Sequence, residues 1–410
     1  MTGKDVPMSD TRNDLPLGFS AGAAAAGFKK AGRDDLGLIV SDRPAVLAGL
    51  FTTNAFKAAP VQVCQQTLRE YDTCRAVLAN SGQANACTGD EGLENCLETR
   101  RMVAALTGLA PHEIMPMSTG VIGDQLKMDC WREAVPSLVE SLGSRDAEGF
   151  TRAFMTTDAF PKFASITVPL SGGTVRLTGM AKGAGMICPN MATMLAVMLT
   201  DADVDRETWQ AMFARAVDKT FNRVSVDGDT STNDMCTVLA NGMAGNAEIT
   251  AEGPAYEAFC EALQAVMQDL ARKIAADGEG ASKLMTCTVK GAKDEETAEV
   301  LAKSIAGSSL TKAAMFGSDA NWGRVLCAMG YSGAAFNTEK VLVEFASKEG
   351  SIAVCEDGRG LDFDEDLAKK ILSQDEVEIN VTLQEGSGSA TCWGCDLTYD
   401  YVKINGDYRT

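Results

Sequence analysis

Apolar positions recur along the chain with two spacings, which predict both helices and strands. Steps of three and four residues indicate amphipathic helices, whereas short apolar runs between turn residues indicate strands. The clearest helix is expected over residues 254–276, and its apolar stripe runs from Phe259 to Ile274. A second helix is expected after Thr88, whose side chain would cap it. The other predicted helices cover residues 124–142, 205–221, 294–304 and 364–372.

The strand-like runs are mixed with these helices in no regular order. Residues 38–40 and 46–51 predict two short strands around a turn at 41–44, and the alternation from Val377 to Leu383 predicts a hairpin that closes the chain. Because the elements do not alternate as βαβ units, we expect a layered α+β architecture, with sheets covered by helices, and not a Rossmann or barrel fold. The remaining predicted strands cover residues 76–78, 166–170, 175–180, 193–199, 284–289, 325–329, 341–345 and 352–355.

The chain is long, acidic and rich in apolar residues. Its 410 residues include 56 Asp and Glu against 37 Lys and Arg, a formal net charge of −19 at pH 7. Nucleic-acid-binding proteins and proteins of anionic membrane surfaces rely on basic side chains, so neither partner is expected. The first residues lack the apolar core of a signal peptide, and no stretch has the roughly 20 apolar residues that span a bilayer. We therefore expect a cytoplasmic protein.

The histidine and cysteine patterns exclude several catalytic classes. The only histidine, His112, lies in a predicted loop, and we interpret it as a surface or turn residue. A histidine-rich metal site is excluded, and a Ser-His-Asp enzyme would have to use this one residue. The 13 cysteines are irregularly spaced, and we expect them to be reduced, buried apolar side chains. The pair Cys392 and Cys395 lacks a second pair for zinc.

Two glycine-rich or acidic runs do not match cofactor motifs. Residues 278–283 resemble part of a phosphate-binding loop, but Lys283 stands where glycine is required. Residues 227–234 resemble a calcium loop, but Thr232 stands where glycine is required. The acidic run is either a tight polar turn or a functional loop, since so many carboxylates and hydroxyls need partners when buried. We expect no metal and no resident cofactor.

A nucleophile that supplies its own base needs neither histidine nor metal. The free amine of an N-terminal threonine has a pKa of about 7.7 to 8.0 and can accept the proton of its own hydroxyl near neutral pH. The segment 182–195, KGAGMICPNMATML, is rich in glycine and proline before Thr193 and strand-like after it. From the residues alone, this segment is a loop that enters a strand.

The same segment closely resembles the self-cleavage signature of the ornithine acetyltransferase (glutamate N-acetyltransferase) family of arginine biosynthesis. Further blocks that look like family motifs follow in family order, from about residue 17 to the end of the chain. Together they are far more specific than any single motif. These blocks are residues 51–54, 57–60, 80–86, 118–123, 225–234, 277–280, 316–324 and 400–410.

The resemblance implies that the precursor cuts itself between Ala192 and Thr193. The products would be an alpha chain of residues 1–192 and a beta chain of residues 193–410, which stay associated and pair further into an α2β2 assembly. The implied fold is a helix–sheet–sheet–helix sandwich in which the new N-terminal threonine begins a central strand. This fold agrees with the mixture of elements read from the sequence.

The implied reaction is acetyl transfer from N-acetyl-L-ornithine to L-glutamate. The Thr193 hydroxyl would attack the acetyl carbonyl, ornithine would leave an acetyl-enzyme, and the amine of glutamate would then take the acetyl group. Thr119 and Gly120 match the family's donors to the tetrahedral oxyanion, and one such donor can contribute roughly 2.7 to 4 kcal/mol. Without the family, residues 118–120 are a strand-to-helix turn that caps a helix near Asp124.

The family's substrate-binding positions carry over residue by residue. Lys182 would hold a carboxylate, and Glu279 would hold the cationic amine of ornithine. Without the family, both would be interpreted as solvated surface residues. The matching positions are Thr156, Lys182, Thr193, Glu279, Asn405 and Thr410.

Two other functions stay open from the sequence. The first is an amidase or aminopeptidase on the related self-cleaving fold, with water in place of glutamate as the acceptor. The second is a binding protein that keeps the scaffold and never cleaves. The sequence also leaves open whether acetyl-CoA serves as a second acetyl donor.

Overall fold

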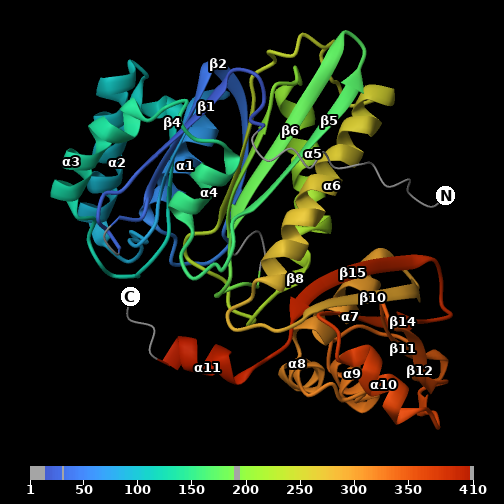
Figure 1. Ribbon diagram of the computed structural model, residues 1–410. Helices are drawn as coiled ribbons and strands as arrows, with labels where there is room; N and C mark the ends of the chain where they lie inside the picture. The colour runs from blue at the N-terminus through green and yellow to red at the C-terminus, as the bar shows by residue number, and fades with distance from the viewer. Residues whose placement is uncertain (1–13, 30–31, 189–193, 407–410) are drawn as a thin grey trace.

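The computed structural model describes residues 14–29, 32–188 and 194–406, which form two units (Figure 1). The first unit is built around an eight-stranded mixed sheet in the order β4-β3-β2-β9-β7-β6-β5, with β1 paired to β2. Its strands are β1 (Phe19–Ala24), β2 (Leu36–Phe51), β3 (Thr73–Asn80), β4 (Ile114–Ser118), β5 (Lys162–Leu170), β6 (Gly173–Lys182), β7 (Leu195–Thr200) and β9 (Met235–Ala240).

The long strand β2 belongs to both halves of this sheet. Its first half pairs with β1 and β3, and its second half pairs with β9, with an irregular register between Val40 and Ala45. The two halves face each other, because Val77 of β3 and Val197 of β7 share one apolar cluster. Helix α4 (Ala147–Phe154) lies between the halves and adds Phe150 to that cluster.

Helices cover the outer faces of both halves. Helices α2 (Gly89–Thr107) and α3 (Met128–Glu140) pack on β2 and β3, whereas α5 (Arg206–Lys219) and α6 (Pro254–Ala276) pack on β6 and β7. Helix α1 (Ala59–Glu70) contributes to the central cluster. Helices therefore cover the outer face of each sheet half, so the predicted α+β sandwich is confirmed.

The second unit has a seven-stranded sheet in the order β13-β12-β11-β14-β10-β15-β8. Helices from this part of the chain build one core with it, and α6 of the first unit contacts β10 and β15. Helix α11 (Tyr399–Gly406) leaves this unit toward the first one (Figure 1). The elements are β8 (Val224–Ser225), β10 (Leu284–Ala292), α7 (Glu295–Gly307), α8 (Ser309–Phe316), α9 (Trp322–Gly330), β11 (Leu342–Ser347), β12 (Gly350–Glu356), β13 (Arg359–Gly360), α10 (Glu365–Leu372), β14 (Glu376–Thr382) and β15 (Gly388–Cys395).

Two strand predictions were wrong for local reasons. Residues 38–40 and 46–51 are one strand, because the guanidinium of Arg75 donates to the carbonyls of Ser41 and Asp42 and holds the expected turn inside β2. Residues 325–329 belong to helix α9 and not to a strand, since short apolar runs do not separate the two.

The predicted closing hairpin was also wrong. Strand β10 lies between β14 and β15, parallel to β14 and antiparallel to β15. Thr288 of β10 is opposite Asn380 on one side and Thr391 on the other. The turn after Leu383 therefore crosses the end of β10. The pairing of β10 with β14 joins residues roughly 90 positions apart, and no local pattern encodes it.

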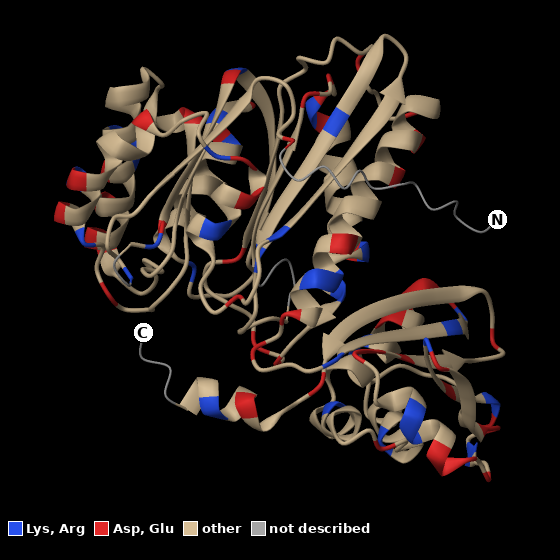
Figure 2. Cartoon of the chain, viewed as in Figure 1, with Lys and Arg blue, Asp and Glu red and all other residues tan. Residues whose placement is uncertain are grey.

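Helix ends depart modestly from the predictions. Helix α3 begins at Met128 and not at Asp124, and α2 continues to Thr107. Thr88 is at the N-cap position of α2, but its hydroxyl donates to Asn85 and does not cap the helix. None of the helices in the described parts of the chain is both long and apolar enough to cross a membrane. Acidic residues are spread over both units (Figure 2).

Candidate active site

A cavity of about 650 Å³ opens where the ends of the first unit's strands meet α11. The structure brings six of the predicted site residues to its wall, from five separate segments of the chain. Met194 and Leu195, at the start of β7, also line it. Ala192, Thr193 and Thr410 lie outside the described residues. The six residues are Thr119, Gly120, Thr156, Lys182, Glu279 and Asn405.

The loop that carries Thr119 is held from two sides. The Ser118 hydroxyl donates to Asn80 Oδ1 at 2.6 Å, and the Thr119 N–H donates to the Asn80 carbonyl at 3.1 Å. From the other side, Asn233 Nδ2 donates to the Ser118 carbonyl at 2.8 Å. These bonds fix the position of the Thr119 hydroxyl and backbone beside the cavity.

Gly120 has a backbone that only glycine adopts here. Its φ is +137°, and a Cβ at this position would lie 2.3 Å from the carbonyl carbon of Gly82. The expected strand-to-helix turn is not formed, since α3 starts only at Met128. The N–H of Gly120 is therefore not part of a helix N-terminus.

Lys182 and Glu279 are buried, so their interpretation as solvated surface residues was wrong. Each is 8% exposed. Lys182 Nζ donates to the Thr119 hydroxyl at 3.3 Å, and burial lowers the pKa of Lys182 while the charge of Asp158 opposes that shift. Lys182 thus brings a positive charge to the wall that carries Thr119.

Glu279, in the loop after α6, lines the same cavity as Lys182. Its Oε2 accepts a hydrogen bond from Asn405 Nδ2 at 2.8 Å, which ties α11 to the first unit. A Cβ on Gly185 would lie 2.3 Å from the Glu279 carboxyl carbon, so glycine is needed for this approach. The cavity thus carries a buried cation, Lys182, and two buried carboxylates, Glu279 and Asp234, which suits amphoteric amino acids.

The acidic run over residues 227–234 holds the segment that precedes residue 189. Asp227 accepts from the N–H groups of Met186 and Ile187 at 2.7 and 2.8 Å, and burial raises the pKa of Asp227. The Thr230 hydroxyl donates to the Cys188 carbonyl at 2.8 Å. Of the two interpretations left open, the functional loop is the better one, because residues 231–234 also line the cavity.

The side chains of the other catalytic classes lie elsewhere. His112 stacks on Tyr71 with ring centroids 4.0 Å apart and does not line the cavity. Burial raises the pKa of Cys392 to about 12 and also raises that of Cys395, so neither is a thiolate at neutral pH. Within residues 14–29, 32–188 and 194–406, no His, Cys, Asp and Glu cluster is arranged to hold a metal ion.

Comparison with known proteins identifies the family of this chain. The ArgJ family profile matches residues 20–410. The curated "Arginine biosynthesis bifunctional protein ArgJ" of Nitratidesulfovibrio vulgaris is 51% identical over 396 residues, which cover 96% of this chain and 99% of that protein. The chain belongs to the ArgJ family. The resemblance to ornithine acetyltransferases that the motifs indicated is thus confirmed.

Two solved structures are also similar to this ArgJ-family chain. A crystal structure of the bifunctional protein ArgJ from Bacillus halodurans has 45% identity and a TM-score of 0.48, and it covers 51% of this chain and 96% of its own. Ornithine acetyltransferase from Mycobacterium tuberculosis, solved in complex with ornithine, has 36% identity and a TM-score of 0.40. It covers 45% of this chain and 99% of its own.

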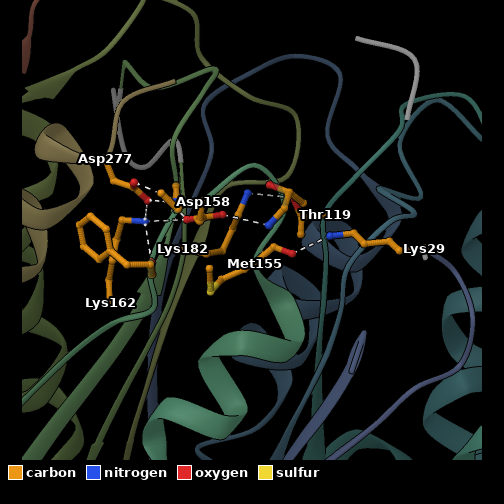
Figure 3. A network of polar contacts seen from close by, with 11 residues as sticks. Lys29, Thr119, Met155, Asp158, Lys162, Lys182 and Asp277 are labelled. Carbon is orange, nitrogen blue, oxygen red and sulfur yellow. Dashed lines mark hydrogen bonds and ion pairs between the residues drawn. The ribbon is translucent and has the colours of Figure 1, made fainter. Parts of the chain in front are cut away.

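Three charged residues beside the cavity were missed by the sequence reasoning. Asp158, Lys162 and Asp277 form a buried ion-pair cluster behind Lys182 (Figure 3). A signal for them was present. Asp158 and Lys162 belong to the TTDAFPK stretch around Thr156, and Asp277 begins a family-like block.

Proposed function

We propose that this chain transfers the acetyl group of N-acetyl-L-ornithine to L-glutamate and so releases L-ornithine and N-acetyl-L-glutamate. One observation carries the proposal. Six predicted site residues from five segments of the chain line one cavity. Thr193, the candidate nucleophile, directly precedes the cavity residue Met194 in the sequence. The membership of the ArgJ family and the curated name of its relatives, an arginine-biosynthesis protein, support the pathway.

In the proposed first step, the Thr193 hydroxyl attacks the acetyl carbonyl while the Thr193 amine takes the hydroxyl proton. Collapse of the tetrahedral intermediate breaks the amide bond, the leaving nitrogen of ornithine takes a proton, and an acetyl ester remains on Thr193. The amine of glutamate then attacks the ester, and the threonine oxygen recovers its proton. No metal and no resident cofactor takes part.

The cavity walls supply the charges that these steps need. Thr119 and the backbone of Gly120 would donate hydrogen bonds to the oxyanion, each donor contributing roughly 2.7 to 4 kcal/mol to the transition state. Lys182 would pair with a substrate carboxylate and Glu279 with the cationic amine of ornithine. Thr156, Asn405 and Thr410 would complete the substrate contacts.

We further propose that the chain cuts itself between Ala192 and Thr193 and that residues 1–192 and 193–410 stay together. The sheet supports this idea, because β7 of the second fragment pairs with β6 of the first, and β9 of the second fragment pairs with β2 of the first. The two fragments would therefore share one continuous hydrogen-bonded sheet. Two such heterodimers would form an α2β2 assembly in the cytoplasm.

We also infer that acetyl-CoA can load the same threonine, since the curated relative is named bifunctional. In that reaction the thiol of CoA replaces ornithine as the leaving group. Incubation of the cleaved protein with acetyl-CoA and glutamate should release CoA and N-acetylglutamate. A protein that makes N-acetylglutamate only from N-acetylornithine would refute this second activity and leave the first intact.

The main proposal is tested by incubating the protein with N-acetylornithine, with and without glutamate. Ornithine release that depends on glutamate, together with equal formation of N-acetylglutamate, is the expected result. Release of free acetate at the same rate without glutamate would indicate an amidase. The absence of both products would indicate a binding protein that keeps the scaffold.

A further inference from the structure

Behind the cavity, charged side chains from separate elements meet in one buried cluster (Figure 3). Lys162 Nζ, at the start of β5, is 2.7 Å from Asp158 Oδ1 and 2.5 Å from Asp277 Oδ2. The side chains of Lys162 and Asp158 are fully buried, and that of Asp277 is 5% exposed. Lys182 lies next to this cluster and extends to Thr119 on the cavity wall (Figure 3).

The carboxylate of Asp158 holds two segments of the cavity wall. Its Oδ2 accepts from the N–H of Thr156 at 2.9 Å, and its Oδ1 accepts from the N–H of Gly183 at 2.7 Å. Thr156 is a proposed substrate contact, and Gly183 directly follows Lys182. One buried carboxylate therefore fixes the backbone at two proposed binding residues.

Asp277 holds a third segment. It follows the last residue of α6, and its two carboxylate oxygens accept from the Ala159 N–H at 3.2 and 3.0 Å. Glu279 lies two residues further along, where its N–H donates to the Ala184 carbonyl at 2.9 Å. Through Lys162, the position of Glu279 is thus linked to those of Thr156 and Lys182.

Together with Lys182, the cluster has equal numbers of positive and negative charges. Asp158 and Asp277 contribute two negative charges, and Lys162 and Lys182 contribute two positive ones. In a buried site, removal of one partner leaves an uncompensated charge, which is far less favourable than the loss of a neutral contact. A change at any member should therefore alter the charge and the position of Lys182.

We propose that Asp158, Lys162 and Asp277 are positioning residues that set the place and the charge of Lys182, and the place of Glu279, for their substrates. This inference rests on the proposed acetyl transfer, and it adds a buried layer behind the residues that contact substrate. None of the three lines the cavity. They act by holding Thr156, Lys182 and Glu279 at fixed separations, and a displacement of 1 Å in such groups can lower a rate roughly a hundredfold.

The cluster should also govern the pH dependence. Lys182 faces Asp158, Asp234 and Glu279, which favour its charged form, and Lys162, which disfavours it together with burial. Lys29 adds a further positive charge nearby. Because Asp158 is the strongest of the opposing charges, its removal should lower the pKa of Lys182 further. The alkaline limb of kcat/KM should then move to lower pH.

Four variants of the full chain test the inference. Lys162→Met leaves the carboxylates of Asp158 and Asp277 with Lys182 as the only positive charge of the group. We expect kcat/KM for N-acetylornithine to fall roughly tenfold to a hundredfold, mainly through a higher KM. The double variant Lys162→Met with Asp277→Asn restores the charge balance and keeps an amide oxygen as acceptor for Ala159. Asp158→Asn should show the alkaline shift. Glu299→Gln is the control, because Glu299 pairs with the buried Arg223 and does not line the cavity.

Rescue separates charge balance from a purely structural role. We expect the double variant to have a higher kcat/KM than Lys162→Met, whereas a structural cluster would give an equal or lower value. Glu299→Gln should keep the wild-type KM and pH profile. An unshifted alkaline limb in Asp158→Asn, or a double variant no better than the single one, overturns the inference. If Lys162→Met does not fold, Asp277→Asn alone must raise KM, and an unchanged KM overturns the inference equally.

Failure of this inference differs from failure of the proposed function. Activity is normalised to the fraction of each variant that has been cleaved before Thr193. A wild-type protein that shows no glutamate-dependent transfer overturns the proposed function. A wild-type protein that is active, with variants of unchanged kinetics, overturns only the positioning role.

Discussion

Two buried lysines, one in each unit, show how differently the two regions use charge. Lys162 of the first unit binds two carboxylates that continue to the cavity wall. Lys283 of the second unit donates instead to the carbonyls of Met315 and Leu372 at 2.6 and 2.7 Å and to a serine hydroxyl at 2.8 Å. The first lysine thus connects to candidate catalytic machinery, whereas the second joins the C-terminal ends of α8 and α10. Substitutions near the cavity should therefore change kinetics most, and those in the second unit should change stability most.

Among substitutions of described residues, the largest kinetic effect is expected from Gly120→Ala. The added Cβ would meet the Gly82 backbone at 2.3 Å and displace the proposed oxyanion donors, so kcat should fall roughly 10²- to 10³-fold. Steady-state assays measure this change. Gly123→Ala is the matched control, because Gly123 also has a positive φ but no atom lies near its Cβ position. Equal losses in both variants would contradict the oxyanion role.

Glu279→Gln should produce the next largest effect. Loss of the carboxylate charge removes the proposed ion pair to the amine of ornithine. KM for N-acetylornithine should rise roughly tenfold to a hundredfold, since a charged hydrogen bond contributes roughly 1.5 to 3 kcal/mol. Self-cleavage should persist, which denaturing electrophoresis would show. The control is Glu257→Gln, an exposed position on α6. A variant that fails to cleave would mean that Glu279 has a structural role instead.

Lys283→Met tests the second unit. Three hydrogen bonds to a charged donor would be lost, so the free energy of unfolding in denaturant should fall by about 2 to 4 kcal/mol. KM should stay at the wild-type value for the protein that remains folded. A change of KM that the loss of folded protein does not explain would contradict this difference between the two units.

The smallest effect concerns Lys29, whose Nζ donates to the Met155 carbonyl at 2.6 Å at the edge of the cavity network. Burial lowers its pKa to about 8 from 10.5. The folded state then binds fewer protons than the unfolded state between these pH values, so stability rises with pH in that window. Relative to Lys29→Met, the wild type should gain stability as the pH rises from about 8 to 10.5. A constant difference between the two proteins would contradict the shift.

The sequence predicted the layered α+β fold and the residues around the cavity better than it predicted strand pairing. Helix α6 was predicted with its observed bounds, because its apolar stripe and its initial proline are local signals. The parallel pairing of β10 with β14 joins distant segments and has no local signature. Likewise, Lys162 and Asp277 are 115 residues apart, so their ion pair exists only in the folded chain.

Family-like motifs were the reason that the cavity residues could be named at all. Taken singly, Lys182 and Glu279 are residue types that usually lie on the surface. Their burial became visible only in the fold, where β6 and the end of α6 come together. Asp158 was overlooked because its bond to the Gly183 N–H joins segments 25 positions apart, which only folding brings together. Motif resemblance thus identified residues at the cavity wall, and the structure was needed for the layer behind them.

The most direct test of the account is to follow the appearance of the fragment 193–410, whose new N-terminus is residue 193, together with activity. Intact-mass analysis during maturation should show a fragment that begins Thr193-Met194-Leu195, and glutamate-dependent acetyl transfer should rise in proportion to that fragment. Thr193→Ser should cleave itself and transfer acetyl groups more slowly than the wild type, and Thr193→Ala should do neither. Acetyl transfer by a chain that is still continuous across residues 192 and 193 would contradict the central claim.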